Sequence, residues 1–291
     1  MKSFPSGMQK ITRHWEKMPA LNTSKRKQPL NFMFPQPLLI FLGNHNMSYA
    51  HPTKDKAFLE NLINAFEQQY KVLNEEERQA VKMIFSYLAG QNQAISENYD
   101  AIAHFYDDLL SFMGYQVPAK IAQALTECLN WHHQNLTIFD AGAGTGLLGD
   151  FFRKAEFKGR LIGLDISEKS IQYIQKHRSG VYNKAKVGDL TDLSGISDAS
   201  IDVVASAGVI GIAPPESLDE LLRITKPGGL MVYSFNKARY ESEPTWEQKH
   251  QSFLQQKRWQ PIEGYPKTYL YYNNQQLKAP GYFHLFMFEK I

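Results

Sequence analysis

The chain has 291 residues, of which 43% are hydrophobic and 21% are charged, a composition that excludes a largely disordered protein. The formal net charge is +3, but residues 1–46 hold seven basic side chains and one acid, so the rest of the chain is mildly acidic. The folded part therefore offers no broad electrostatic attraction for nucleic acid, and no nucleic-acid partner is expected.

The first 50 residues show no sustained periodicity, because five prolines interrupt any helix. We expect residues 1–50 to form a disordered basic tail, with Met47 as an alternative first residue. The longest apolar run there, Pro37–Leu42, is much shorter than the roughly 20 residues of a membrane-spanning helix. We therefore expect no membrane partner and a cytoplasmic location.

Residues 51–93 are expected to form a helical extension. Phe58, Leu62 and Phe66 recur at helical spacing, and Asn74 is a suitable cap for a second helix that begins with three glutamates. The sequence leaves three roles open for this pair of helices. The first role is to cover an active site, the second is to contact a partner, and the third is to pack on the rest of the protein.

Further along, the only cysteine, Cys128, lies in an apolar helical pattern with Ile121, Leu125 and Leu129, and is expected in the core. A single cysteine excludes disulfides within the chain and cysteine-rich zinc sites, and we predict no metal site.

From Leu136 onward, short apolar strands alternate with amphipathic helices. The expected strands are Thr137–Asp140, Arg160–Asp165, Lys184–Val187, Ile201–Ala205, Leu230–Phe235, Thr268–Tyr272 and Tyr282–Glu289. The expected helices are Leu147–Lys154, Ser170–His177 and Ser217–Thr225. This alternation predicts a mainly parallel sheet with helices on both faces.

A glycine-rich loop, Asp140-Ala-Gly-Ala-Gly-Thr-Gly146, follows the first of these strands and opens a helix. Glycines let the chain turn sharply and let a ligand press against the backbone, and the N-terminus of a helix attracts an anionic group. The spacing is G-x-G-x-G, whereas a dinucleotide-binding loop has G-x-G-x-x-G.

Two further acids follow the next strands. Asp165 ends the second strand, where a carboxylate can accept hydrogen bonds from ribose hydroxyls. Asp189 follows the third strand, where it can accept a bond from an adenine amino group beside the apolar Leu190. Asp165 alone fits either NAD or another adenosine ligand, whereas the glycine spacing and Asp189 count against an NAD-dependent oxidoreductase.

Together with Leu221–Leu230, these segments resemble the successive motifs of class I S-adenosylmethionine (SAM)-dependent methyltransferases. Within that class the chain resembles the methyltransferase-like proteins named after the Williams–Beuren syndrome region. The matching features are Tyr99-Asp-x-x-Ala-x-x-Tyr-Asp107, Gly208-Val-Ile and an aromatic C-terminal strand pair.

The resemblance implies an α/β, Rossmann-like domain over residues 94–291, with a mainly parallel seven-stranded sheet whose last strand is antiparallel. It implies SAM as cofactor, lying across the carboxyl ends of the strands. The implied cofactor-binding residues are Tyr99, Tyr106, Asp140, Gly142, Ala143, Gly144, Gly146, Asp165, Ile166, Asp189, Leu190, Ser206, Ala207 and Gly208.

Within this set the resemblance gives each segment a role. The glycine loop meets the methionine part of SAM and Asp140 supports the loop. The residues from Ser206 to Gly208 line the pocket near the sulfonium. Tyr99 and Tyr106 belong to a helix that covers SAM, and their spacing of seven places both on one face of it.

No catalytic residue is assigned, because methyl transfer mainly requires alignment of donor and acceptor. A general base is needed only when the acceptor must lose a proton. His104 and His284 are the available histidines, but each is more simply explained as a structural or surface residue.

The favoured function is methyl transfer from SAM to an unidentified acceptor, with a small molecule as first choice. The alternative is a SAM-binding regulatory or adaptor protein without catalysis, which uses the helices of residues 54–90 as its contact surface. After the fourth strand the chain lacks the Asn/Asp-Pro-Pro-Tyr/Phe motif of adenine and glutamine methylation. The oligomeric state stays open.

Overall fold

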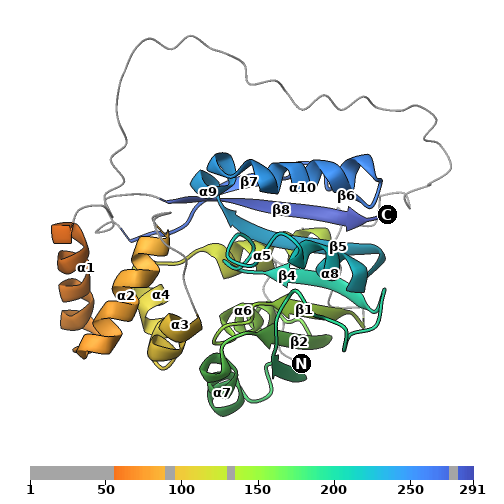
Figure 1. Cartoon of the computed structure of the whole chain (residues 1–291). Coiled ribbons are helices and arrows are strands. Elements are labelled where there is room, and N and C mark those ends of the chain that lie inside the picture. Colours follow the sequence, from red (N-terminus) through yellow and green to blue (C-terminus); the bar gives the residue numbers. More distant parts are fainter. Residues whose placement is uncertain (1–55, 89–95, 130–134, 275–280) are drawn as a thin grey trace, which may run out of the picture. The chain divides into compact units, whose positions relative to one another are not determined.

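The structure is a computed structural model that describes residues 56–88, 96–129, 135–274 and 281–291 (Figure 1). The expected tail of residues 1–50, with Met47 and the apolar run Pro37–Leu42, lies outside the described residues. All described elements belong to one compact unit. In the described ranges, no helix is both long enough and apolar enough to cross a membrane.

A single sheet forms the centre of this unit, in the strand order β3-β2-β1-β4-β5-β8-β6, with β7 also paired to β8. The strands are β1 (Thr137–Ala141), β2 (Arg160–Asp165), β3 (Lys184–Val187), β4 (Ile201–Ser206), β5 (Thr225–Asn236), β6 (Trp259–Pro261), β7 (Lys267–Leu270) and β8 (Tyr282–Lys290). Strands β1 to β5 pair in parallel, and β8 runs antiparallel to β5. The expected parallel sheet with an antiparallel last strand is confirmed.

The outer edge beside β8 is built from two short strands. β6 pairs with the end of β8 from Phe288 onward, and β7 pairs with its beginning, from Tyr282 to Leu285. Pro261 ends β6 and Pro266 precedes β7, and a proline cannot donate a hydrogen bond to a strand ladder. The sheet therefore has seven strand positions, of which one is filled by two pieces.

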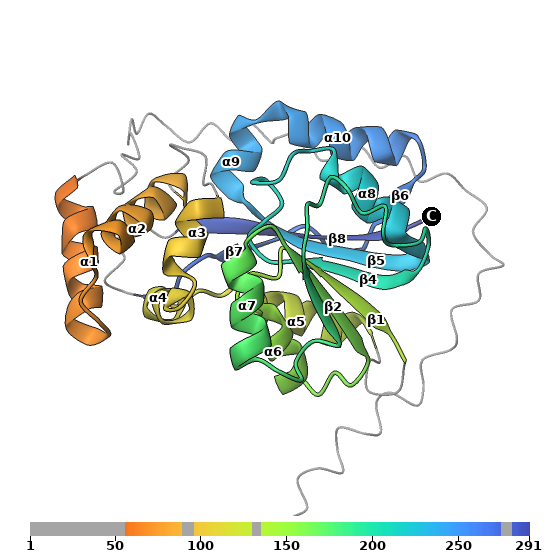
Figure 2. The same cartoon turned by 60° about the horizontal axis from the view of Figure 1, so that its bottom comes forward.

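Helices cover both faces of the sheet (Figure 2). One face is packed by α5 (Val117–Cys128) and α6 (Leu147–Lys154), and the other by α8 (Ser217–Ile224) and α10 (Pro244–Gln255). Two further helices are α7 (Glu168–His177) and α9 (Lys237–Ser242). Ile138 and Phe139 are neighbours in β1 and point to opposite cores, as side chains of a strand buried on both faces must.

Cys128 is exposed, so its expected place in the core is wrong. It is the last residue of α5, and the chain turns to an extended conformation at Leu129. The final turn of the helix ends at the surface, with the thiol 3.6 Å from the sulfur of Met287. The core stripe of the helix is instead formed by Ile121 and Leu125.

A third apolar cluster joins four helices at one end of the sheet. These are α1 (Lys56–Gln69), α2 (Glu75–Leu88), α3 (Ser96–Ile102) and α4 (Tyr106–Met113). Asn74 caps α2 as expected, since its side chain accepts a bond from the Glu77 N–H and the Glu77 carboxylate accepts one from the Asn74 N–H, both at 2.9 Å. Side chains before and after residue 93 share this cluster.

Candidate functional site

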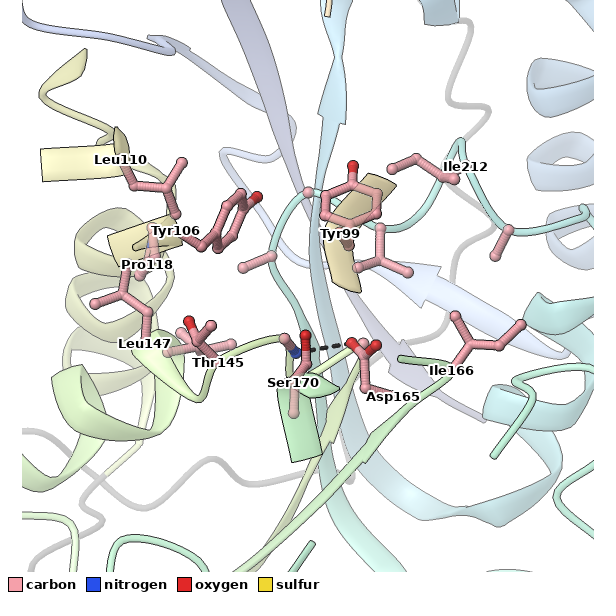
Figure 3. A pocket seen from close by; sticks show the side chains of 18 of the residues that line it. Tyr99, Tyr106, Leu110, Pro118, Thr145, Leu147, Asp165, Ile166, Ser170 and Ile212 are labelled. Atoms are coloured by element: carbon pink, nitrogen blue, oxygen red, sulfur yellow. Dashed lines mark hydrogen bonds between the residues drawn. The ribbon is translucent and has the colours of Figure 1, made fainter. Parts of the chain in front are cut away.

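A cavity of about 420 Å³ opens at the carboxyl ends of the parallel strands (Figure 3). This is where open α/β sheets bind ligands, and its size lies within the roughly 300–1,000 Å³ of small-molecule sites. One side of its wall consists of the loops after β1, β2, β3 and β4. The other side consists of α2, α3, α4, the start of α5 and the pair Tyr271 and Tyr272.

The glycine loop after β1 brings backbone to the cavity wall. Gly142 has a φ of +76°, and a Cβ there would lie 2.2 Å from a methyl carbon of Val209. Gly144 has a φ of +53°, and no atom lies within 4 Å of the place its Cβ would take. The loop is also fixed to β2, because the N–H groups of Gly142 and Ala143 both donate to the Leu164 carbonyl. Only glycine fits at Gly142, the positive φ favours glycine at Gly144 as well, and Gly144 lines the cavity.

Asp165 stands at the end of β2, directly beside this loop (Figure 3). Its Oδ2 accepts a bond from the Gly144 N–H at 2.7 Å and its Oδ1 accepts one from the Ser167 N–H at 2.9 Å. Burial raises the pKa of this carboxyl, while the backbone N–H donors oppose that shift. The Ile166 backbone is a third, weaker donor to this carboxyl, and because a carboxylate has about four acceptor positions, acceptor capacity remains for a ligand.

The loops after β2 and β3 supply a partly apolar wall. Ile166 is 60% exposed although it is a large apolar residue, and it lines the cavity together with the buried Leu190. Asp189 also lines the cavity, and its Oδ1 accepts bonds from the N–H and the hydroxyl of Thr191, both at 2.8 Å. The second oxygen of Asp189 is left for a ligand donor.

Three of the predicted cofactor-binding residues do not line the cavity: Asp140, Gly146 and Ser206. Ser206 is buried and donates to the carbonyl of Ala141 at 2.7 Å, and Gly146 caps the start of α6. Ser206 thereby joins the ends of β4 and β1, whereas Gly146 ends the glycine loop where α6 begins. The other eleven residues of the predicted set line the cavity.

Asp140 is fully buried behind the glycine loop. Its Oδ2 accepts a bond from the Tyr182 hydroxyl at 2.6 Å, and that hydroxyl accepts one from the Gly149 N–H at 3.1 Å. Within the part of the chain that the structure describes, the Oδ1 of Asp140 has no hydrogen-bond partner. Burial raises the pKa of Asp140 to about 7, although the Tyr182 bond opposes this.

Tyr99 and Tyr106 do not share one helix, so that prediction is wrong. Tyr99 lies in α3 and Tyr106 begins α4, because the chain turns at residues 103–105, where Phe105 enters the apolar cluster of α1 to α4. The two rings nevertheless meet edge to face with centroids 5.9 Å apart, and both line the cavity (Figure 3).

Each of these tyrosines is followed by an aspartate that binds the other side of the cavity. Asp100 accepts a short bond from the Ser167 hydroxyl, next to Asp165. Asp107 accepts bonds from the Thr145 hydroxyl at 2.6 Å and from Arg178 at 2.5 Å. The helices that cover the cavity are therefore tied to the loops after β1 and β2.

Sequence reasoning missed much of the wall contributed by the covering elements and by the loop after β4. These lining residues are apolar or aromatic: Ile84, Leu110, Met113, Tyr115, Pro118, Val209, Ile212, Ala213, Pro214, Tyr271 and Tyr272. No spacing motif joins them, and the aromatic C-terminal segment was the only signal for Tyr271 and Tyr272. His104 and His284 do not line this cavity, since His104 pairs with Glu77 and His284 with Thr268.

This strand order, with a glycine loop after β1 and acids at the ends of β2 and β3, defines the class I methyltransferase fold. Residues 132–268, slightly less than half of the chain, match the family model described as "Methyltransferase domain". The narrower resemblance to the Williams–Beuren region proteins stays a prediction.

Curated relatives share only part of their length with this chain. A malonyl-[acyl-carrier protein] O-methyltransferase of Pectobacterium atrosepticum is 30% identical over 105 residues, which are 35% of this chain and 39% of that protein. One of Coxiella burnetii is 28% identical over 144 residues, covering 48% and 46% respectively. The chain thus matches less than half of each of these two relatives.

Among solved structures, a TehB-like SAM-dependent methyltransferase of Corynebacterium glutamicum aligns with a TM-score of 0.47 and 20% identity, over 67% of this chain and 98% of that one. The putative methyltransferase in a complex with the Haloferax volcanii Trm112 activator aligns with a TM-score of 0.49 and 20% identity, over 66% and 95%.

Proposed function

We propose that the chain binds SAM in this cavity and transfers its methyl group to a small-molecule acceptor. The observation that carries the proposal is the position of Asp165. Its carboxylate is fixed by the Gly144 N–H, faces the cavity and keeps free acceptor positions beside an open glycine loop. Such a carboxylate suits the two hydroxyls of a ribose.

The remaining wall fits the other parts of SAM. Asp189 can accept a bond from the adenine amino group, while Ile166 and Leu190 offer apolar surface to the adenine ring. The open side of Gly144 leaves room for the methionine part. The unpartnered Oδ1 of Asp140 gives the site a negative or acceptor group behind the loop, which suits a cationic donor.

When bound, SAM supplies a methyl group on a positively charged sulfur. The residues of this chain bind and orient the two reactants and keep water away, which is the main requirement of such a displacement. Tyr99 and Tyr106 cover the cavity, and the electron-rich faces of aromatic rings favour a positive charge.

The names of the curated relatives describe methyl transfer to a malonyl group on an acyl carrier protein. A malonyl thioester is therefore a reasonable first acceptor to assay. A SAM-binding regulator without catalysis is the second candidate function, since binding residues alone do not prove turnover. The two are separated by whether S-adenosylhomocysteine accumulates when SAM is incubated with the protein and a set of acceptors.

The donor site is tested by calorimetric titration of the protein with SAM and with NAD. We expect SAM to bind and NAD not to bind. Asp165→Ala should weaken SAM binding by about 100-fold, because bonds to a charged group contribute roughly 1.5–3 kcal/mol each. Asp198→Ala is the matched control, as Asp198 is an exposed aspartate that pairs with Arg223 and does not line the cavity. Equal SAM affinity in both variants, or tighter binding of NAD, would contradict the proposal.

A further inference from the structure

Among the described residues, the covering side of the cavity carries five tyrosines, and four of them lie near the fifth, Tyr115. Tyr115 stacks on Tyr271 with centroids 5.7 Å apart and lies 6.1 Å from the ring of Tyr272. Burial raises the pKa of Tyr115 well above its usual value, and the nearby hydroxyls of Tyr271, Tyr106, Tyr272 and Tyr99 raise it further. These five residues are named here the tyrosine wall.

Tyr115 lies where the two sides of the cavity meet. A Cβ on Gly208 would be 2.6 Å from the Tyr115 hydroxyl oxygen, so the phenol packs directly on the backbone that follows β4. Tyr115 also lines the cavity. It can therefore bond to a group of a bound molecule.

Among the described residues that line the cavity, charged side chains occur on the donor side. Asp165 and Asp189 are the only charged residues among the described residues that line the cavity, and both belong to the proposed SAM-binding wall. On the acceptor side the tyrosine wall continues into apolar residues such as Leu110, Met113 and Ile212. A carboxylate acceptor placed there would be desolvated without a cation to pair with it, which is costly.

The residues that line the cavity also disfavour acceptors that must lose a proton. On the described part of this wall no histidine, lysine or carboxylate faces the acceptor side, and a phenol with a raised pKa stays protonated at neutral pH. An alcohol acceptor needs a base during transfer. An uncharged amine or ring nitrogen needs neither a base nor a counter-ion, because its lone pair is available at once.

We propose that the acceptor is an uncharged nitrogen on an apolar, preferably aromatic, body, and that the tyrosine wall binds the cation formed when this nitrogen is methylated. This inference rests on the proposed function. The nitrogen lone pair forms the new N–C bond while the S–C bond breaks and its electron pair stays on sulfur. The positive charge thus moves from sulfur to nitrogen, and any N–H proton is released afterwards to water. Aromatic faces stabilise such a cation in a site shielded from water.

The tyrosine wall is tested by the binding of three phenyl compounds that have nearly the same shape. They are trimethylphenylammonium, tert-butylbenzene and benzenesulfonate, with charges of plus one, zero and minus one. Binding is measured with the full chain saturated with S-adenosylhomocysteine, which fills the donor side without a sulfonium charge. We expect the cation to bind about tenfold more tightly than the neutral compound, and the anion to bind more weakly than either.

Three variants test whether the tyrosine wall causes the preference for the cation. Tyr115→Leu should remove most of the preference for the cation, whereas Tyr115→Phe should keep it because the aromatic face is retained. Tyr282→Leu is the control, since Tyr282 is exposed on β8 and does not line the cavity. If Tyr115→Leu does not fold, the charge series measured on the wild-type chain still decides whether the site prefers the cation.

The outcomes separate this inference from the proposed function. If S-adenosylhomocysteine does not bind, the donor site itself is wrong. If it binds and the anion equals or exceeds the cation in affinity, the donor site stands and the nitrogen acceptor is overturned. Methylation of a malonyl thioester in preference to 4-benzylpyridine, a neutral ring nitrogen on an apolar body, would overturn it as well.

Discussion

Asp140 has two opposite effects on the stability of the folded protein. Its carboxyl supports the glycine loop through Tyr182, yet one of its oxygens is buried without a partner. A buried carboxylate of this kind costs stability unless a positive group compensates it. The cost should be largest in the ligand-free protein and should depend on pH.

Asp140→Asn should change that pH dependence. The pKa of Asp140 is raised from 3.8 to about 7 in the folded protein, so the folded state holds this proton more tightly than the unfolded state. Its contribution to stability is therefore full below pH 4, falls as the pH rises toward 7 and stays low above 7. The difference corresponds to about 4 kcal/mol in order of magnitude, at about 1.4 kcal/mol per pH unit.

The measurement is urea unfolding of the ligand-free protein between pH 5 and pH 8.5. Relative to wild type, Asp140→Asn should gain stability as the pH rises, while Asp198→Asn, at an exposed aspartate, should show a constant offset. A constant offset for Asp140→Asn as well would mean that Asp140 is ionised throughout this range.

At the level of single residues, the sequence predicts some site residues well and others not at all. Gly142, Gly144 and Asp165 were predictable because a ligand needs bare backbone and a carboxylate at fixed distances along neighbouring strands. Tyr115 and Tyr271 were not predictable, because 155 intervening residues must fold before these two rings stack. Their role depends on tertiary packing, and no local spacing encodes it.

The helices that cover the cavity are positioned by buried polar anchors. Arg178, with a side chain only 9% exposed, ends α7 and donates to Asp107 of α4, to Asp150 of α6 and to the Thr145 carbonyl in the glycine loop. One guanidinium thus joins three elements, and its planar fork suits such a site better than an ammonium group does.

Arg178→Met should therefore weaken SAM binding by tenfold or more, because the loop and α4 lose their common partner. Arg153→Met is the matched control. Arg153 is also partly buried and donates to the carbonyls of Val181, Phe157 and Gly159, away from the cavity. Both variants should lose about 1–3 kcal/mol of stability, but Arg153→Met should keep its affinity for SAM. Titration with SAM and thermal unfolding test this pair, and equal affinities would show that Arg178 serves stability alone.

Element boundaries were less predictable than the elements themselves. The seven-residue spacing of Tyr99 and Tyr106 suggested a single helix, but burial of Phe105 among α1 to α4 breaks the chain into two. The helix α10 went unpredicted, although Trp246, His250 and Phe253 lie on one buried face of it. The spacing of apolar residues alone did not show which surfaces of the protein these helices would pack against.

Across the unit, apolar side chains form three separate main clusters, two against the faces of the sheet and one among α1 to α4. The third cluster contains no residue of the sheet. It nevertheless touches the cavity, since Ile84 of α2 and Leu110 of α4 belong to both the cluster and the cavity wall. The helical extension is therefore part of the site in this structure, and its packing should control the cover over the cavity.

Phe66→Ala should show that the helices α1 to α4 unfold locally, independently of the sheet. Phe66 is 1% exposed and its ring lies within 6 Å of the rings of Tyr70, Phe105 and Phe112. Removing the ring should lower the stability of the cluster by about 3–5 kcal/mol. We expect this loss to exceed the free energy that keeps the four helices folded against one another. We expect faster amide hydrogen exchange throughout α1 to α4, unchanged exchange in β1 to β5 and a clear loss of SAM affinity.

Phe253→Ala provides the comparison, since Phe253 is equally buried but belongs to the cluster under α10. That variant should lose a similar amount of global stability, with exchange increased around α10 and with SAM affinity retained. If Phe66→Ala instead accelerates exchange evenly over the helices and the sheet, the four helices and the sheet unfold together. The extension would then stabilise the whole domain, and control of the cavity would have to come from the Asp100 and Asp107 anchors alone.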